Sequence, residues 1–252
     1  MRILRYILSV ACVAMLTTSC VVSRAILYGD ASVDDYRAFE QENIAKGDYT
    51  FRFAESERML DTMRFEWMHF GRGEMAQMTI DEAIAPSVDN AAILIIHRDT
   101  ILYERYFGEW SKCTQSQIFS VTKTITAMLC GVALTEGHIR SVEDRVTEYL
   151  PELKQADPMF GELKIKHLLD MTAGLDFDEN YSFNPFSKMA KLYMGRNTMR
   201  IIEQTKFSHK PGERYDYNSL TTAILGVVIE RATGMPYAEY LSSKIWQPLG
   251  ME

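Results

Sequence analysis

The segment from Ser120 to Thr135 constrains the fold more strongly than any other part of the chain. As a helix it would carry apolar residues on nearly all sides, and its one charged residue is Lys123. Gly137 follows at the point where such a segment would end. This length and composition predict a buried helix. An ammonium group in a buried helix is costly unless it has a partner or a chemical task.

Ser120 and Lys123 form an S-x-x-K pattern at the start of this helix. Residues three apart share a helical face, so the hydroxyl and the amine can lie within hydrogen-bond reach. A neutral amine there can take the hydroxyl proton and activate the serine as a nucleophile, and the helix dipole favours a nearby oxyanion. The structural alternative is a serine that caps the helix beside a lysine that extends to the surface.

Two short strands are predicted upstream of this helix. Residues 91–98 are apolar and β-branched, Asp99 and Thr100 turn the chain, and residues 101–107 alternate. Further helices are expected at Lys164–Met171, closed by Gly174, at Ser219–Ala232, ending at Gly234, and from Pro236 through Trp246. The order of strands, buried helix and helical cluster favours an α+β fold.

Composition excludes several functional classes. The chain has 27 Lys and Arg against 34 Asp and Glu, a net charge of −7, and no extended basic cluster, so nucleic-acid binding is not expected. The 4 cysteines and 5 histidines are scattered without the spacing of metal ligands, and we expect neither a metal nor a cofactor. Cys113 and Cys130 could form a disulfide, or Cys130 could be a buried thiol.

Residues 1–19 have the pattern of a signal peptide. Arg2 and Arg5 precede an apolar run, and small residues follow it immediately before Cys20. Such a cysteine is similar to that of a bacterial lipobox, which carries lipid in the mature chain, although Thr17 stands where lipoboxes usually have Leu. We therefore expect an exported lipoprotein of the bacterial cell envelope, periplasm-facing or in the outer membrane, anchored through Cys20. The alternative is an ordinary cleavable signal in which Cys20 is incidental.

The remaining chain changes character near residue 80. Residues 20–80 are charged and aromatic without a clear period, which predicts an N-terminal extension that wraps a core. Residues 81–252 contain the strands, the S-x-x-K helix and the helical cluster, and are predicted to form the main domain.

From near Ile80 to its last residue, the chain resembles the serine β-lactamases of class C type and their relatives among penicillin-binding proteins, DD-peptidases and esterases. Four landmarks carry the resemblance, in family order: F-S-V-T-K at 119–123, H-L-L-D-M-T-A-G-L at 167–175, P-G-E-R-Y-D-Y-N-S at 211–219 and P-L-G-M at 248–251. The resemblance implies a β-lactamase/transpeptidase-like fold, in which helices flank an antiparallel sheet beside a helical subdomain.

The resemblance also implies roles for particular residues. Ser120 would be the acylated nucleophile, Lys123 its proton acceptor and Tyr217 the second catalytic group. A phenol near cations can shuttle a proton to a leaving group. Tyr215 is the rival tyrosine, but the distance of Tyr217 from the P-G pair matches the family segment, and the structural alternative for either is aromatic packing.

The chain departs from the family pattern at two points. Ser219 stands where the family usually has Asn, which leaves one short hydroxyl to bind substrate and favours a peptidase, amidase or esterase over a good β-lactamase. The sequence also contains no K-T-G or H-x-G motif after the P-L-G-M landmark. We therefore expect the C-terminal strands of the family fold to be missing, in a chain truncated at its C-terminus.

These observations predict an exported serine hydrolase that cleaves an amide, peptide or ester bond in a small molecule or peptide through an acyl-enzyme on Ser120. One alternative is a lipoprotein of the same fold that binds peptidoglycan peptides, or senses them, without turning them over. Another is a purely structural envelope lipoprotein, in which replacing Ser120 changes nothing.

Overall fold

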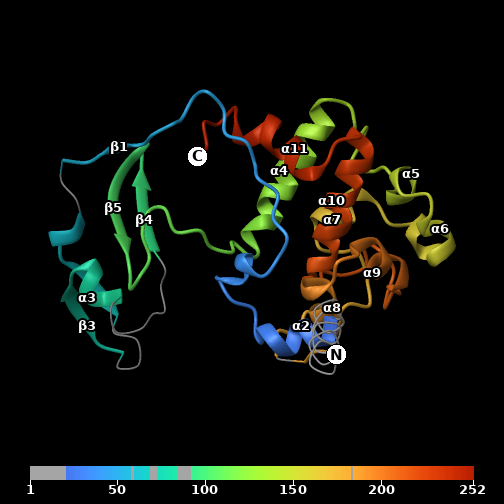
Figure 1. Cartoon of the computed structure of the whole chain (residues 1–252), viewed down its shortest axis with the longest axis horizontal. Helices are drawn as coiled ribbons and strands as arrows, with labels where there is room; N and C mark the ends of the chain where they lie inside the picture. The colour runs from blue at the N-terminus through green and yellow to red at the C-terminus, as the bar shows by residue number, and fades with distance from the viewer. Residues whose placement is uncertain (1–20, 58–59, 69–72, 85–91, 183) are drawn as a thin grey trace, which may run out of the picture. The chain divides into compact units, whose positions relative to one another are not determined.

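The chain forms two compact units. A computed structural model describes residues 21–57, 60–68, 73–84, 92–182 and 184–252 (Figure 1). One unit is Thr50–Gln115, and the other joins the described residues up to Tyr49 with Ser116–Glu252. The predicted signal peptide at 1–19 and the predicted lipidation site at Cys20 lie outside the described residues. The predicted boundary near residue 80 stays a prediction.

The unit Thr50–Gln115 is built on the predicted hairpin. Strand β4 (Ala92–His97) pairs antiparallel with β5 (Thr100–Tyr106), and the short strand β1 (Ala54–Glu55) pairs parallel with the other edge of β5. The turn consists of Arg98 and Asp99, both with positive φ, rather than Asp99 and Thr100 as predicted. Thr100 is already paired with His97, so it belongs to the strand.

Two further strands in this unit were not predicted. Strand β2 (Phe65–Met68) pairs antiparallel with β3 (Met75–Met78), and helix α3 (Ile80–Ile84) follows. Side chains on both strands alternate between half-buried and exposed, as expected for a sheet with one covered face. Tyr103 of β5 is buried, and its hydroxyl donates a hydrogen bond to Asp81 of α3 at 2.6 Å.

The second unit is helical and contains all four landmarks. Its helices are α2 (Val21–Tyr28), α4 (Val121–Thr135), α5 (Val146–Tyr149), α6 (Leu153–Ala156), α7 (Ile165–Leu169), α8 (Lys188–Met194), α9 (Thr198–Gln204), α10 (Ser219–Thr233) and α11 (Tyr237–Leu241), which continues as a π-helical turn over Ser242–Trp246. The helices predicted in these regions are confirmed, with ends that differ by a few residues. Among the residues that the structure describes, no helix combines the length and hydropathy needed to cross a bilayer.

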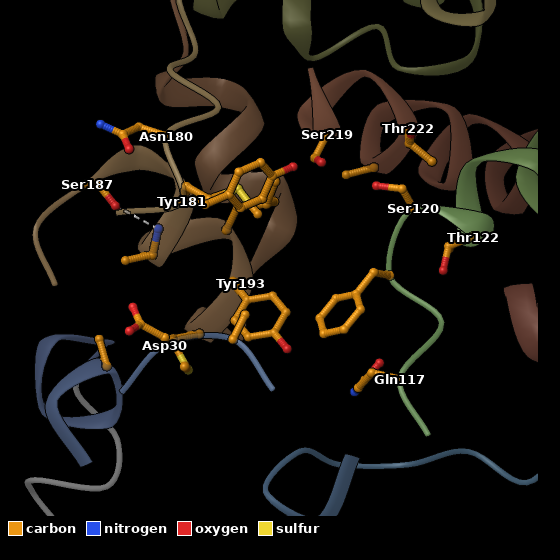
Figure 2. Close-up of a pocket in the computed structure, with 18 of the residues that line it drawn as sticks. Asp30, Gln117, Ser120, Thr122, Asn180, Tyr181, Ser187, Tyr193, Ser219 and Thr222 are labelled. Carbon is orange, nitrogen blue, oxygen red and sulfur yellow. Dashed lines mark hydrogen bonds between the residues drawn. The ribbon is translucent and has the colours of Figure 1, made fainter. Parts of the chain in front are cut away.

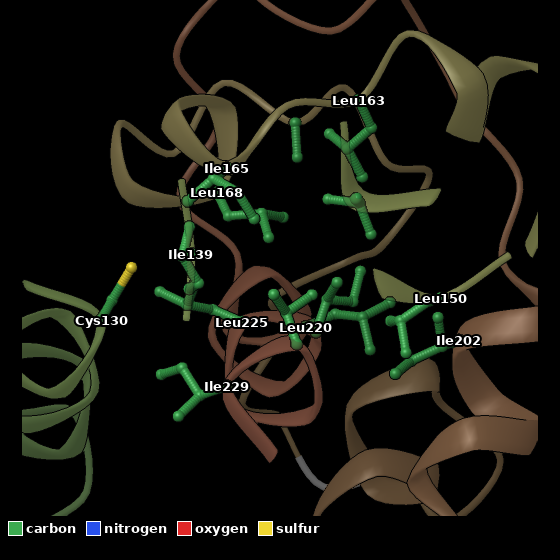
Figure 3. Packing of buried hydrophobic residues seen from close by; sticks show 14 of the residues in the cluster. Cys130, Ile139, Leu150, Leu163, Ile165, Leu168, Ile202, Leu220, Leu225 and Ile229 are labelled. Atoms are coloured by element: carbon green, nitrogen blue, oxygen red, sulfur yellow. The ribbon is translucent and has the colours of Figure 1, made fainter. Parts of the chain in front are cut away.

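Helices α4 and α10 pack together at the centre of this unit, and α7 packs on α10 (Figures 1 and 3). Their contact surfaces are apolar and fully buried at Leu129, Leu220 and Ile224. Asn218 caps α10 by accepting a hydrogen bond from the Leu220 N–H at 2.9 Å, and Gly234 ends the helix with a φ of 69°. Helices α4 and α10 together position the residues of the site described below.

Helix α4 has one buried face and one exposed face. Thr126, Leu129 and Cys130 are buried, whereas Val121 is 58% exposed and Met128 is 49% exposed. Apolar residues therefore lie on both faces of this helix. Cys130 is a free buried thiol whose pKa is raised by burial to about 11, and Cys113 is a free exposed thiol.

The N-terminal segment of the helical unit packs against α8. Helix α2 lies along α8, and the buried Arg24 donates a hydrogen bond from Nη1 to the Met194 carbonyl at 2.7 Å. The Tyr193 hydroxyl donates to the Asp35 carboxylate at 2.9 Å, which fixes the following turn. Residues 21–49 therefore belong to the helical unit, whereas residues 50–80 fall in the other unit.

Candidate active site

Ser120 lies directly before the first turn of α4. The residue before it, Phe119, has a φ of 42°, a left-handed conformation that is unfavourable for a bulky side chain and is often found at functional sites. Ser120 occupies the N-cap position, but its side chain makes no capping hydrogen bond. The structural alternative, a serine that caps the helix, therefore does not describe what this hydroxyl does.

Lys123 is half-buried and extends along α4 toward two serine hydroxyls. Its Nζ lies 3.2 Å from Ser120 Oγ and 2.9 Å from Ser219 Oγ, at the start of α10. The amine is thus held between two hydroxyls instead of extending to the surface. This arrangement accounts for a lysine within an apolar segment, because the polar head has specific partners.

Tyr217 also contacts the Ser120 hydroxyl. Its hydroxyl donates a hydrogen bond to Ser120 Oγ at 2.8 Å, and Lys123 Nζ lies 4.8 Å from the centre of its ring. Tyr215, the rival tyrosine, is 67% exposed. The structure therefore brings Tyr217 and Lys123 to the same serine oxygen. The helical spacing predicted this for Lys123, and the family resemblance implied it for Tyr217.

The segment that carries Tyr217 is held in place by the landmark at 167–175. After α7, the chain turns at Met171, with a φ of 55°. The Met171 carbonyl accepts a hydrogen bond from the Asp216 N–H at 2.7 Å, and the Thr172 carbonyl accepts one from the Gly212 N–H at 2.7 Å. These bonds fix the backbone immediately before Tyr217, so this landmark supports the site without contributing to its chemistry.

Glycine is required at Gly174 within this support. Its φ is 74°, and a Cβ there would lie 2.4 Å from the His209 carbonyl oxygen. Any larger residue would push the two segments apart. The packing of these two segments explains why the landmark contains a glycine at this position.

Glu179 is a site residue that the sequence did not reveal. Its Oε2 accepts a hydrogen bond from the Ser219 N–H at 2.8 Å, and its Oε1 accepts one from Ser219 Oγ at 2.5 Å. The Tyr181 hydroxyl also donates to Oε1, at 2.5 Å. Burial, followed by this hydrogen bond, raises the pKa of Tyr181 to about 12, so the phenol stays protonated and acts as a donor. The loop has no periodic pattern, and Glu179 is 40 residues from Ser219, so no local signal connects them.

Ser120 opens into a large pocket within the helical unit. The cavity has a volume of about 780 Å³, within the range of small-molecule sites. Figure 2 shows Ser120 and Ser219 on one side, Asp30 and Ser187 on the other, and the rings of Tyr181 and Tyr193 between them. Apart from Lys123, Asp30 and several hydroxyl and amide groups, the walls are largely apolar. The predicted substrate-binding residue Ser219 is thus part of the pocket wall.

The described residues contain no cluster of three or more His, Cys, Asp and Glu side chains that could hold a metal ion. The polar groups around Ser120 are instead an amine, a phenol and a second hydroxyl. This set can move protons and provide a nucleophile, which is the chemistry of covalent acyl transfer.

Two solved structures share the fold of this chain. A Bacillus anthracis protein provisionally assigned as a 6-aminohexanoate-dimer hydrolase matches with a TM-score of 0.71 and 24% identity, over 86% of this chain and 58% of that one. EstCE1, described as a hydrolase with promiscuous acyltransferase activity, matches with a TM-score of 0.51 and 22% identity, over 64% of this chain and 46% of its own. At these identities the likeness establishes the β-lactamase/transpeptidase-like fold.

The Beta-lactamase family model matches residues 78–252, and the chain belongs to that family. "Protein flp" of Staphylococcus aureus (strain COL) is 27% identical over 173 residues, which are 65% of this chain and 34% of that protein. The 6-aminohexanoate-dimer hydrolase of Paenarthrobacter ureafaciens is 27% identical over 169 residues, 63% of this chain and 42% of its own. The chain thus spans less than half the length of these two relatives.

Proposed function

We propose that the protein is an exported serine hydrolase that cleaves an amide, peptide or ester bond through an acyl-enzyme on Ser120. The observation that carries this proposal is the environment of one oxygen. Ser120 Oγ lies 3.2 Å from an amine and 2.8 Å from a phenol, beside a pocket large enough for a small molecule or a short peptide. Membership of the Beta-lactamase family and the similarity to a named hydrolase support it.

Acylation follows from these contacts. Lys123 Nζ in its neutral form takes the proton from Ser120 Oγ, and Oγ forms a bond to the carbonyl carbon of the substrate while the carbonyl π electrons move to oxygen. The tetrahedral intermediate then collapses, and the bond to the leaving group breaks. Tyr217 contacts the same oxygen and gives its own hydroxyl proton to the departing nitrogen or oxygen, which leaves a phenolate. Water then attacks the carbonyl carbon of the ester and gives a proton to this phenolate. The bond to Oγ breaks, Lys123 returns its proton to Ser120 Oγ, and the acid is released.

The start of α4 contributes to this step through its dipole. The N–H groups of Val121 and Thr122 already donate to the carbonyls of Ile118 and Phe119, at 3.0 and 3.1 Å. An oxyanion beside Ser120 is therefore stabilised by the positive potential of the helix N-terminus rather than by these two donors.

The substrate class is constrained by Ser219. Lys123 and Glu179 both contact its hydroxyl, so this group has little remaining capacity to hold a substrate amide as an asparagine would. We therefore place simple amides and esters, with an apolar portion that fits the aromatic pocket, ahead of β-lactams. No part of the proposal involves nucleic acid, a metal or a cofactor.

Pre-steady-state kinetics with a chromogenic ester such as p-nitrophenyl acetate tests the proposal. The expected result is a burst of one nitrophenol per protein followed by steady turnover, because acylation and hydrolysis are separate steps. A burst with no turnover would favour the alternative, a binding or sensor protein of the same fold. The absence of both burst and turnover would contradict the proposal.

Replacing Tyr217 by Phe should slow acylation by about 10² to 10³-fold, because it removes the proton donor while leaving the ring in place. Tyr215→Phe is the matched control, since this tyrosine lies two residues away and is largely exposed. The measurement is the acylation rate of each variant on an anilide such as p-nitroacetanilide, because its departing nitrogen needs a proton whereas p-nitrophenolate leaves without one. Equal rates for Tyr217→Phe and the wild type, or an equal loss in both variants, would remove Tyr217 from the proton-transfer role.

The proposed location is the bacterial cell envelope, with the mature chain anchored in the membrane by lipid on Cys20. The support is the pattern of residues 1–20. In a bacterial host that processes lipoproteins, mass spectrometry of the mature N-terminus should find a diacylated or triacylated cysteine at position 20, and the Cys20→Ala variant should leave the membrane fraction. An unmodified terminus at another residue would instead indicate an ordinary signal peptide.

A further inference from the structure

The carboxylate of Glu179 is joined to Ser120 by a continuous chain of polar contacts. Glu179 Oε1 lies 2.5 Å from Ser219 Oγ, Ser219 Oγ lies 2.9 Å from Lys123 Nζ, and Lys123 Nζ lies 3.2 Å from Ser120 Oγ. The pocket is lined by Ser120, Lys123 and Ser219 in the described structure, but not by Glu179. The contacts through Ser219 and Lys123 therefore connect Glu179 to the reacting oxygen, while its contact with Tyr181 leads to the pocket wall.

The donors and acceptors in this series of hydrogen bonds can be assigned from the chemistry of the groups. Glu179 accepts hydrogen bonds from the Ser219 N–H, the Ser219 hydroxyl and the Tyr181 hydroxyl. The Ser219 hydroxyl hydrogen therefore points toward Glu179, and a lone pair of Ser219 Oγ faces Lys123. Lys123 Nζ is within hydrogen-bond distance of both hydroxyls and donates to both as an ammonium group. When the amine is neutral and one N–H still donates to Ser219, its lone pair can face Ser120.

We infer that Glu179 is a positioning residue that fixes the Ser219 hydroxyl so that Lys123 presents its lone pair to Ser120. The inference rests on the proposed function. Without the carboxylate, the Ser219 hydroxyl can rotate and donate its hydrogen to Lys123 Nζ. That hydrogen bond occupies the same lone pair that must receive the Ser120 proton, and acylation slows.

Glu179 also makes a second contact, which would be sufficient if the residue only stabilised the structure. Its Oε2 accepts the Ser219 N–H at the first turn of α10, where a negative charge stabilises the helix. The two roles can be separated, because Ser219→Ala removes the hydroxyl and keeps the backbone N–H. In a Ser219→Ala background, Glu179 still stabilises the helix but has no hydroxyl to orient.

A double-mutant cycle tests the inference, with the burst rate on p-nitrophenyl acetate and the melting temperature measured for each protein. We expect Glu179→Gln to slow acylation by about 10 to 100-fold while the KM for the ester changes by less than about twofold. The double variant Glu179→Gln/Ser219→Ala should acylate no more than about twofold more slowly than Ser219→Ala alone. Asp178→Asn is the matched control, because it removes one exposed carboxylate from the same loop and should keep the wild-type rate.

Each outcome of the cycle has a distinct meaning. Coupled losses in rate, with melting temperatures that fall equally in both backgrounds, support the positioning role. Additive losses in rate, or a Glu179→Gln variant that acylates like the wild type, overturn it while leaving the proposed function in place. A wild-type protein that gives no burst overturns the proposed function, and this inference with it.

Discussion

Ser120→Ala should lose the burst on a chromogenic ester entirely, with the steady rate falling at least about 10³-fold. The physical reason is that Oγ is the atom that both Lys123 and Tyr217 contact, and no other hydroxyl has both partners among the described residues. Alanine is compatible with the N-cap position here because the serine makes no capping hydrogen bond. The variant should therefore be inactive while keeping the melting temperature of the wild type.

Ser116→Ala is the control for this variant. Ser116 lies in the same segment, is exposed, and donates its hydroxyl to the Gln117 carbonyl. It should keep the wild-type burst. If Ser120→Ala keeps its burst as well, another nucleophile is responsible and the assignment of Ser120 is wrong.

Lys123→Met should slow acylation by about 10² to 10⁴-fold near neutral pH. Methionine has an unbranched side chain of similar size, so it preserves the packing along α4 but cannot take a proton from Ser120. Circular dichroism and the melting temperature should stay close to those of the wild type, because the contacts that are lost are polar and partly exposed. The measurement is the burst rate on the same ester.

Lys154→Met provides the matched control, since this lysine lies exposed on α6. Its burst rate should equal that of the wild type. A Lys123→Met protein that acylates at the wild-type rate would show that the lysine is structural and that Ser120 is activated by another group.

The helical unit could be predicted from the sequence because its signals are local. The S-x-x-K helix ends near Gly137, and α10 lies between the Asn218 cap and Gly234. The strands β2 and β3 were missed because each is only four residues long, in a region rich in charged and aromatic residues. Composition alone does not show which face of α4 is buried, because it indicates that a segment is apolar but not which of its faces contacts another element.

Part of the candidate site could be predicted from the sequence, and part could not. Ser120 and Lys123 are three residues apart at the start of one helix, and Tyr217 lies within the landmark at 211–219. Glu179 could not be predicted, because its contact with Ser219 depends on how the loop after Gly174 returns to α10. Helix N-termini attract carboxylates, but a sequence does not indicate which of many acidic residues will reach one.

The most direct measurement is to find where the protein is acylated or phosphonylated. The protein is treated with a fluorophosphonate, digested, and examined by tandem mass spectrometry. We expect a single adduct on the peptide that contains Ser120, with the mass shift assigned to that residue, because its oxygen is the one held by both an amine and a phenol. An adduct on a different serine, or no adduct on folded protein, would contradict the assignment of Ser120 as the nucleophile.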